Sequence, residues 1–210
     1  MGSLILVAGF FLDLLAGGPA PSCVRQGDRL VCGFHCTSNL TDAACSQTPE
    51  GLCAATPSQV VCWDPPPDVR LIMQSRDDLP QPSCITSING AACGYFCERT
   101  GDRVGCAATP MGACATRFGI LQCWDPAPEV RWEMEARGDL TPASCERTLE
   151  SVACGYRCVS SLKNVQCAQT PWGQCTRSFD AIACWDPQLV AQAPLPPPQP
   201  PKSSSSRFRR

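Results

Sequence analysis

Apolar positions recur along this chain at a fixed distance from cysteine. Nine segments read C-x8-C, and turn-forming residues such as Gly27, Asn89 and Gly101 fall near the middle of several of them. An apolar or small residue stands two places before each closing cysteine, which puts both side chains on one face of a strand. These positions are Leu30, Ala43, Val60, Ala91, Val104, Leu121, Val152, Val165 and Ile182. The pattern predicts short β-hairpins whose apolar side chains and sulfur atoms share one thin core.

The segments are grouped into three copies of one sequence repeat. The copies begin at Cys23, Cys84 and Cys145, so that the repeat is 61 residues long. Each copy reads C-x8-C-x3-C-x8-C-x7-C-x8-C-W-D-P, and no cysteine lies outside this pattern. A Thr-Pro-x-Gly joint at 48–51, 109–112 and 170–173 predicts a type I turn, with proline second and glycine fourth.

The repeat divides the chain into three modules with spacers. We expect a signal peptide at 1–20, modules at 23–65, 84–126 and 145–187, spacers at 66–83 and 127–144, and a tail at 188–210. Residues 1–20 contain a short apolar run followed by small residues, which is typical of a secretory signal and too short to span a membrane. The two spacers match each other, and we expect each to add a strand or to pack against a neighbouring module. The Pro-rich, Ser-rich and basic tail is expected to be disordered.

Composition favours covalent cross-links over a large apolar core. The chain of 210 residues contains 18 cysteines, and modules of about 40 residues rarely hold together by apolar burial alone. Such a density of cysteine is typical of secreted disulfide scaffolds. The predicted fold class is therefore small, disulfide-rich and mainly β, with three tandem six-cysteine modules built of short β-hairpins.

The hairpin register favours one pairing of the cysteines. A two-residue turn places residues i and i+9 opposite each other, which favours a bridge between the two ends of each C-x8-C segment. Bridges between neighbouring hairpins remain an alternative, because six cysteines per module allow many pairings. The favoured pairs are Cys23–Cys32, Cys36–Cys45, Cys53–Cys62, Cys84–Cys93, Cys97–Cys106, Cys114–Cys123, Cys145–Cys154, Cys158–Cys167 and Cys175–Cys184.

A metal site is the rival interpretation of the cysteines. The pair Cys32 and Cys36 has the spacing of one half of a zinc site, but no second close pair follows it. His35 lies between them, and Phe96 and Arg157 take its place in the other copies. We therefore expect no metal and no cofactor.

Catalytic motifs are missing from the sequence. The single histidine is not repeated, and there is no Ser/His/Asp set, phosphate-binding loop or dinucleotide fingerprint. Asp64, Asp125 and Asp186 recur in Trp-Asp-Pro, where we expect each carboxylate to cap the backbone before the proline. The chain carries a net charge of −2, and its tail is basic, so the body is acidic and unsuited to nucleic acid. These features predict a protein that is not an enzyme.

Two sets of residues are candidates for contact with a partner. Trp63, Trp124 and Trp185 recur at equal spacing and either cover the disulfides or form a row of exposed contacts for glycan or peptide. The second candidate is the cell-adhesion tripeptide formed by Arg137, Gly138 and Asp139. A tripeptide arises easily by chance. Asn39 begins a glycosylation sequon that matters only in a eukaryotic secretory path.

The modules resemble a tandem cysteine-rich repeat of uncharacterised secreted or surface proteins of bacteria. The resemblance rests on C-G-Y-x-C followed by C-A-x-T-P-x-G-x-C, and the first copy departs from it at Phe34 and Ser46. It implies export but no known activity.

Together these features predict a secreted or cell-surface, non-enzymatic binding or structural element. Its partner would be a protein or glycan outside the cytoplasm. One alternative is a multi-headed protease inhibitor that uses the variable loops at Glu50, Met111 and Trp172. A second alternative is a thiol-rich metal-binding protein.

Overall fold

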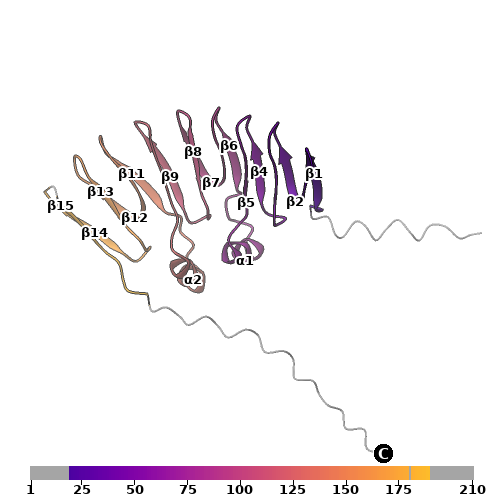
Figure 1. The fold of residues 1–210 in the computed structure, drawn as a ribbon. Coiled ribbons are helices and arrows are strands. Elements are labelled where there is room, and N and C mark those ends of the chain that lie inside the picture. Colours follow the sequence, from indigo (N-terminus) through magenta and orange to yellow (C-terminus); the bar gives the residue numbers. More distant parts are fainter. Residues whose placement is uncertain (1–18, 180, 190–210) are drawn as a thin grey trace, which may run out of the picture.

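The fold is a row of short β-hairpins with two helices along one side (Figure 1). The computed structural model describes residues 19–179 and 181–189. Nearly all of the predicted signal peptide, and the predicted tail from residue 190, lie outside the described residues. The fold class predicted from the sequence is confirmed: the protein is mainly β, disulfide-rich and built of three modules of hairpins.

Each module contains five strands in the same order. Module 1 contains β1 (Ser22–Gln26), β2 (Arg29–Ser38), β3 (Ala43–Ser46), β4 (Leu52–Ala55) and β5 (Val60–Trp63). Module 2 contains β6 (Ser83–Thr86), β7 (Ala91–Thr100), β8 (Arg103–Ala107), β9 (Ala113–Arg117) and β10 (Ile120–Trp124). Module 3 contains β11 (Ser144–Arg147), β12 (Val152–Ser160), β13 (Val165–Ala168), β14 (Gln174–Ser178) and β15 (Ala181–Trp185).

Every C-x8-C segment forms one antiparallel hairpin that a disulfide closes at its base. In the first hairpin Cys23 lies directly opposite Cys32, and in the third Cys53 lies opposite Cys62. The nine disulfides join the two ends of each segment, which is the pairing that the hairpin register favoured. No cysteine of the chain is left free.

The second hairpin of each module folds back beside the first. The long strand β2 pairs with β1 through its first half and with β3 through its second half, and a bulge separates the two at Phe34 to Thr37. His35 in this bulge has a φ of 45°, in the left-handed region. The reversal brings two neighbouring turns together, where the Gln26 side-chain amide donates to the Leu40 carbonyl oxygen at 2.6 Å. All three turns of a module therefore lie on the same edge.

The six sheets stack in chain order. Each module supplies a three-stranded sheet followed by a two-stranded sheet, and every sheet packs against the next one along the chain. The turns of the hairpins line one edge of the stack and the helices lie at the other (Figure 1). Because each sheet contacts only its neighbours, the architecture is that of a linear repeat protein.

The spacers form helices, so the expectation of an added strand was wrong. Helix α1 spans Pro67–Ser75 and helix α2 spans Pro128–Arg137, each with proline in its first turn. Proline is tolerated there because the first backbone N–H groups of a helix have no intrahelical acceptor. Val69 and Ile72 stand three residues apart and are buried on one helix face. The alternative expectation, that the spacers pack against a neighbouring module, is confirmed by a cluster that joins Met134 of α2 to Tyr156 of module 3.

The apolar core lies mainly at the junctions between modules. Ala91 and Val152 are buried there, as the hairpin pattern predicted. Leu30 holds the matching position in module 1 but is 66% exposed, because no sheet of the described residues packs on the outer face of the first hairpin. The expectation of a thin core shared by all nine positions was therefore wrong at the open end of the stack.

Candidate functional site

The repeated aspartates hold the base of each module together. Asp125 accepts hydrogen bonds from the backbone N–H groups of Ala108 and Thr109, both at 2.8 Å, and from the Thr109 hydroxyl at 2.7 Å. Asp64 and Asp186 make the same three contacts in their own modules. Each carboxylate caps the backbone, as expected, but the backbone belongs to the Thr-Pro-x-Gly joint and not to the turn before the following proline. This arrangement is structural.

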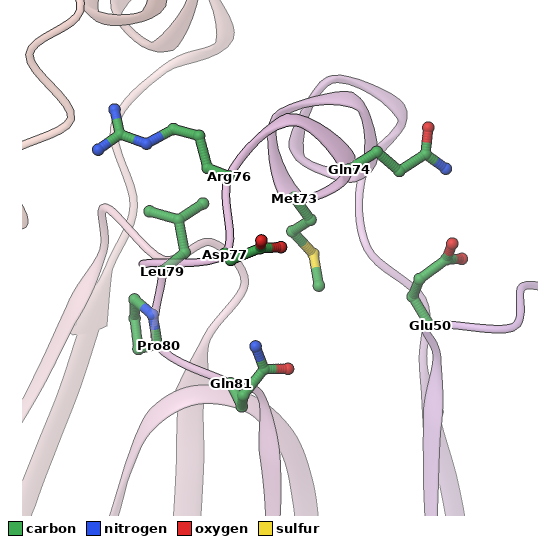
Figure 2. Close-up of a pocket in the computed structure, with 8 residues that line it drawn as sticks. All are labelled: Glu50, Met73, Gln74, Arg76, Asp77, Leu79, Pro80 and Gln81. Carbon is green, nitrogen blue, oxygen red and sulfur yellow. The ribbon is translucent and has the colours of Figure 1, made fainter.

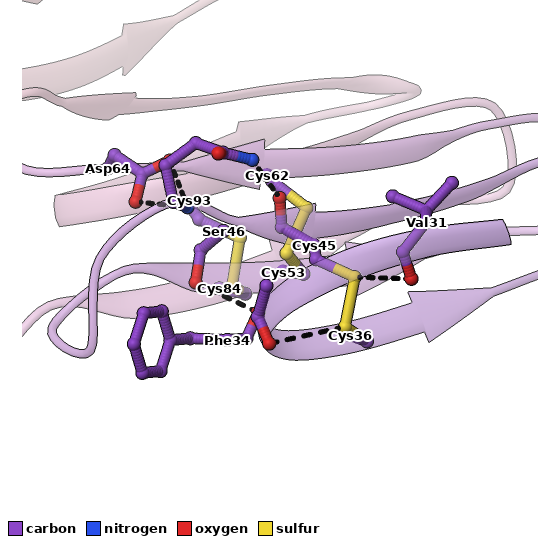
Figure 3. The surroundings of a disulfide bond; sticks show 12 residues. Val31, Phe34, Cys36, Cys45, Ser46, Cys53, Cys62, Asp64, Cys84 and Cys93 are labelled. Carbon is purple, nitrogen blue, oxygen red and sulfur yellow. Dashed lines mark hydrogen bonds between the residues drawn. A yellow bond between two sulfur atoms is a disulfide. The ribbon is translucent and has the colours of Figure 1, made fainter. Parts of the chain in front are cut away.

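The joint that each aspartate caps is packed tightly. The predicted turn is present, because the Gly112 N–H donates to the Thr109 carbonyl oxygen at 3.1 Å, which is the hydrogen bond that closes a β-turn. A Cβ atom on Gly112 would lie 2.6 Å from the Ala107 Cβ and 2.7 Å from the Trp124 carbonyl oxygen. In module 1 the neighbouring Ser46 hydroxyl donates to the Phe34 carbonyl oxygen at 3.0 Å (Figure 3). Glycine is therefore required by space at this joint.

The first two repeated tryptophans lie at the junctions between modules. Trp63 packs edge-on against Tyr95 with ring centroids 5.6 Å apart, and it borders a cluster that includes Cys114. Trp124 packs in the same way against Tyr156. Both indoles are half-buried. The interpretation that they cover disulfides fits this placement better than an exposed row does.

Trp185 differs from the other two tryptophans because, within the described residues, no further module packs against it as modules 2 and 3 pack against Trp63 and Trp124. Its side chain is 63% exposed. Of the three repeated tryptophans in the described part of the chain, it is thus the one whose ring is exposed enough to contact another molecule. The three tryptophans are not brought together into one site.

The buried tyrosines at the junctions have raised pKa values. Burial raises the pKa of Tyr95 to about 12. Burial also raises the pKa of Tyr156, and the nearby Asp139 and Asp125 carboxylates raise it further. Both phenols therefore stay neutral and packed at physiological pH.

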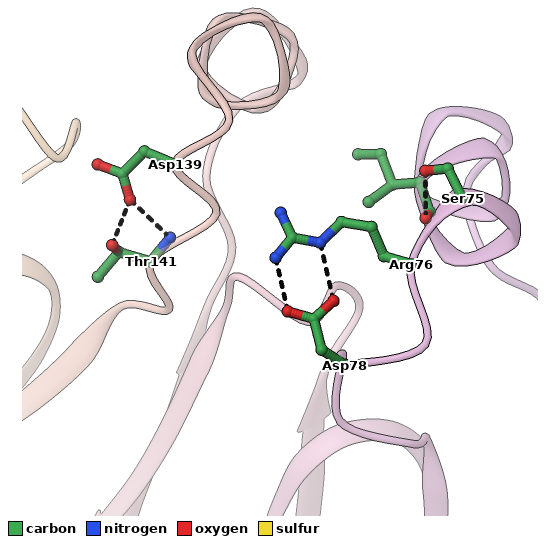
Figure 4. A network of polar contacts seen from close by, with 6 residues as sticks. Ser75, Arg76, Asp78, Asp139 and Thr141 are labelled. Carbon is green, nitrogen blue, oxygen red and sulfur yellow. Dashed lines mark hydrogen bonds and ion pairs between the residues drawn. The ribbon is translucent and has the colours of Figure 1, made fainter.

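The adhesion tripeptide forms the end of helix α2. Gly138 has a φ of 66° and caps the helix, as glycine commonly does at this position. The Arg137 guanidinium pairs with Glu133 at 2.6 Å and lies 4.2 Å from the centre of the Trp172 ring. Asp139 accepts hydrogen bonds from Thr141 (Figure 4). Both charged groups of the tripeptide already have partners within the chain.

The matching spacer between modules 1 and 2 contains an ion pair of its own. Arg76 and Asp78 form a two-pronged contact, which lowers the pKa of Asp78 and raises that of Arg76. Between this spacer and the Glu50 joint lies an open hollow, shown in Figure 2 with Met73 and Gln81 on its rim. Its lining mixes charged and apolar side chains and brings together no catalytic set.

Sequence reasoning missed the edge formed by the hairpin turns. We define the tip edge as the described residues of the turns at 25–30, 38–42, 55–59, 86–90, 100–103, 117–120, 147–151 and 160–164, together with 177–179 and 181. Hydrogen bonds join neighbouring turns along this edge, such as Asn39 to the Thr56 carbonyl oxygen at 2.8 Å and Arg117 to the Thr148 carbonyl oxygen at 3.1 Å. A signal was present in the sequence, because six of the nine C-x8-C segments place a large apolar residue four positions after the opening cysteine. Those residues are Leu40, Ile88, Phe118, Leu149, Leu162 and Phe179.

Within residues 19–179 and 181–189, the structure contains no helix with the length and apolar character needed to cross a membrane. Comparisons of the chain with protein-family models, curated proteins and solved structures found no match.

Proposed function

We propose that the protein is a secreted or cell-surface repeat protein that acts as a non-enzymatic binding or structural element. The proposal draws on the resemblance of the repeat to secreted bacterial cysteine-rich proteins, which is inferred from the sequence motifs alone. Nine disulfides require an oxidising compartment to form and persist, which also favours export. A protein of this kind presents a fixed surface to its partner and carries out no chemistry.

The observation that carries the proposal is the tip edge. Nine hairpins, each closed by its own disulfide, present their turns in one row (Figure 1). A rigid row loses little conformational entropy on binding, and repeated weak contacts gain strength through avidity. This arrangement supports a binding surface that extends over all three modules.

The inhibitor alternative receives less support. A protease-inhibiting loop must protrude so that one side chain can enter the protease, but Met111 is fully buried in its joint. Trp172 is half-buried against the apolar cluster of the second junction. The variable residues of the second and third joints thus fill space inside the molecule, and specificity loops at these places are not proposed.

The metal-binding alternative also receives less support, because it needs thiols. Each of the eighteen cysteine sulfurs belongs to a disulfide. A disulfide sulfur cannot serve as the thiolate ligand that zinc prefers.

The proposal is tested by two measurements on the protein expressed in an exporting host. Intact mass with and without alkylation under denaturing conditions should show nine bridges and no reactive thiol in exported material. The labelled, exported protein should then be retained by the outer surface of cells of the encoding organism. Reduced cysteines in the native protein, or no retention at any surface, would remove the proposed function.

A further inference from the structure

Large apolar side chains stand at six of the nine hairpin tips. They are Leu40, Ile88, Phe118, Leu149, Leu162 and Phe179, of which Leu149 is the least exposed at 68% and Phe179 the most at 95%. A folded protein usually places such side chains in its core. What distinguishes these six is their recurrence at the same position of six hairpins, all on one edge of the stack.

The six side chains protrude singly and do not line a groove. Each one stands at the end of a separate hairpin, and polar turn residues such as Asn39, Asn89 and Lys163 lie between them. A protein partner favours a continuous, well-packed apolar patch. Side chains that protrude separately are better matched to a fluid partner, because each of them can insert independently of the others.

Two of the tips carry phenylalanine at a place that disfavours it. Phe118 and Phe179 have φ angles of 43° and 49°, in the left-handed region. The matching first turn position in two other hairpins is held by Gly27 and Gly101, which adopt positive φ without a steric penalty. Glycine or asparagine at these positions would make the fold more stable. The exposed phenylalanine rings therefore indicate a role other than folding.

Charge is divided between the two edges of the stack. The tip edge carries seven basic residues: Arg25, Arg29, Arg103, Arg117, Arg147, Lys163 and Arg177. Among its described residues it carries four acidic ones: Asp28, Asp42, Asp102 and Glu150. The helix edge, taken as 64–82 and 125–143, carries nine acidic residues and four basic ones. The tip edge is thus the positive side of an acidic body.

We propose that the tip edge docks the protein on an anionic lipid surface. The apolar tips enter the headgroup region, and the flanking basic side chains stay at the level of the lipid phosphates. The acidic helix edge faces away, since an anionic surface repels it. This inference rests on the proposed binding function and names the class of its partner.

The test is co-flotation of the full-length, oxidised protein with vesicles. One set of vesicles contains phosphatidylglycerol and phosphatidylcholine, and the other contains phosphatidylcholine alone. We expect binding to the anionic vesicles, weaker binding to the neutral ones, and a loss of binding as salt concentration rises.

Two double variants distinguish insertion of the tips from nonspecific adsorption to vesicles. The variant Phe118→Asn with Phe179→Asn removes two tips and keeps residues that tolerate positive φ, so its thermal midpoint should not fall. Its affinity for anionic vesicles should fall about tenfold or more. The control Leu71→Gln with Trp132→Gln removes two exposed apolar side chains from the helix edge and should bind as the unaltered protein does.

The outcomes distinguish this inference from the proposed function. Equal binding by both double variants, or no binding of the unaltered protein to anionic vesicles, would overturn lipid docking. If the protein then still adheres to cells through Phe118 and Phe179, its partner is a protein or glycan, and the proposed binding function stands without the lipid.

Discussion

The indole of Trp124 stands edge-on against the ring of Tyr156, with ring centroids 5.5 Å apart and planes inclined at 87°. Trp63 and Tyr95 repeat this relationship one module earlier. In both cases the last strand of one module meets the reversal strand of the next, and such aromatic pairs stabilise beyond the area that they bury. The modules are therefore coupled, although each has its own disulfides.

The two junctions differ in one hydrogen bond, which leads to a stabilising substitution. The Trp124 indole N–H donates to the Gln169 side-chain oxygen at 3.1 Å, whereas the buried Trp63 indole nitrogen has no partner among the described residues. Ala108 holds the position that matches Gln169. Ala108→Gln should raise the free energy of unfolding by about 1 kcal/mol by supplying the missing acceptor. Denaturant unfolding measures this gain, and Ala108→Leu, which lacks an acceptor, serves as its control.

The ion pair between the helices should be sensitive to loss of one partner. Arg131 is 7% exposed, pairs with Asp68 of α1 at 2.5 Å and donates to the Pro126 carbonyl oxygen at 2.7 Å. Arg131→Met should lower the free energy of unfolding by roughly 3 kcal/mol, because it leaves the Asp68 carboxylate poorly solvated and unpaired.

A double variant and a matched position test this cause. Adding Asp68→Asn to Arg131→Met should restore part of the lost stability, since no unpaired charge then remains. Arg70 holds the matching position in α1 and forms no ion pair within the described residues. Arg70→Met should therefore change stability little. Equal losses for the two single variants would show that the pairing is not the cause.

The aspartate at the base of module 2 should contribute through its backbone contacts. Asp125→Ala removes three hydrogen bonds and leaves the Ala108 and Thr109 N–H groups without their acceptor. We expect a loss of about 2 kcal/mol or more, given that an unsatisfied buried donor costs more than a made bond contributes. Glu129→Ala, at an acidic residue in the first turn of α2, is the comparison. A calorimetric scan that shifts equally for both variants would contradict the structural role of Asp125.

The buried tyrosines predict a loss of stability in alkali. The pKa of Tyr95 rises in the fold from 10.0 to about 12, so the folded protein keeps a proton that the unfolded chain releases. The contribution of the protonated tyrosine to the free energy of unfolding is complete below about pH 10 and is lost as the pH rises through about 12. Between these values the free energy of unfolding falls by about 1.4 kcal/mol per pH unit for each tyrosine. Tyr156 adds to this slope, because its pKa is raised as well.

Unfolding measured at a series of alkaline pH values tests this slope. Tyr95 and Tyr156 are the only tyrosines of the chain, so tyrosinate absorbance reports their ionisation without interference from others. Tyr95→Phe should reduce the slope, and Phe34 shows that phenylalanine occupies the same repeat position in module 1. An unchanged slope in this variant would mean that another group is responsible.

Parts of the fold followed from short-range spacing. Eight residues between cysteines, with turn formers at the centre, bring Cys23 opposite Cys32 whatever the rest of the chain does. The helix in each spacer was also predictable from the sequence, because Val69 and Ile72 stand three residues apart after Pro67. The two spacers match each other in sequence, but the expectation of an added strand overlooked this helical spacing.

The sequence by itself determined the hairpins, their disulfides and the division into modules, because these depend on contacts within about ten residues along the chain. Only the tertiary structure decided that all nine turns share one edge. That outcome depends on a reversal at residues as different as His35, Phe96 and Arg157, which are held at positive φ by the strands on either side of them. It depends also on the stacking of one sheet on the next, through contacts between residues far apart in sequence, for which no local pattern gives the geometry.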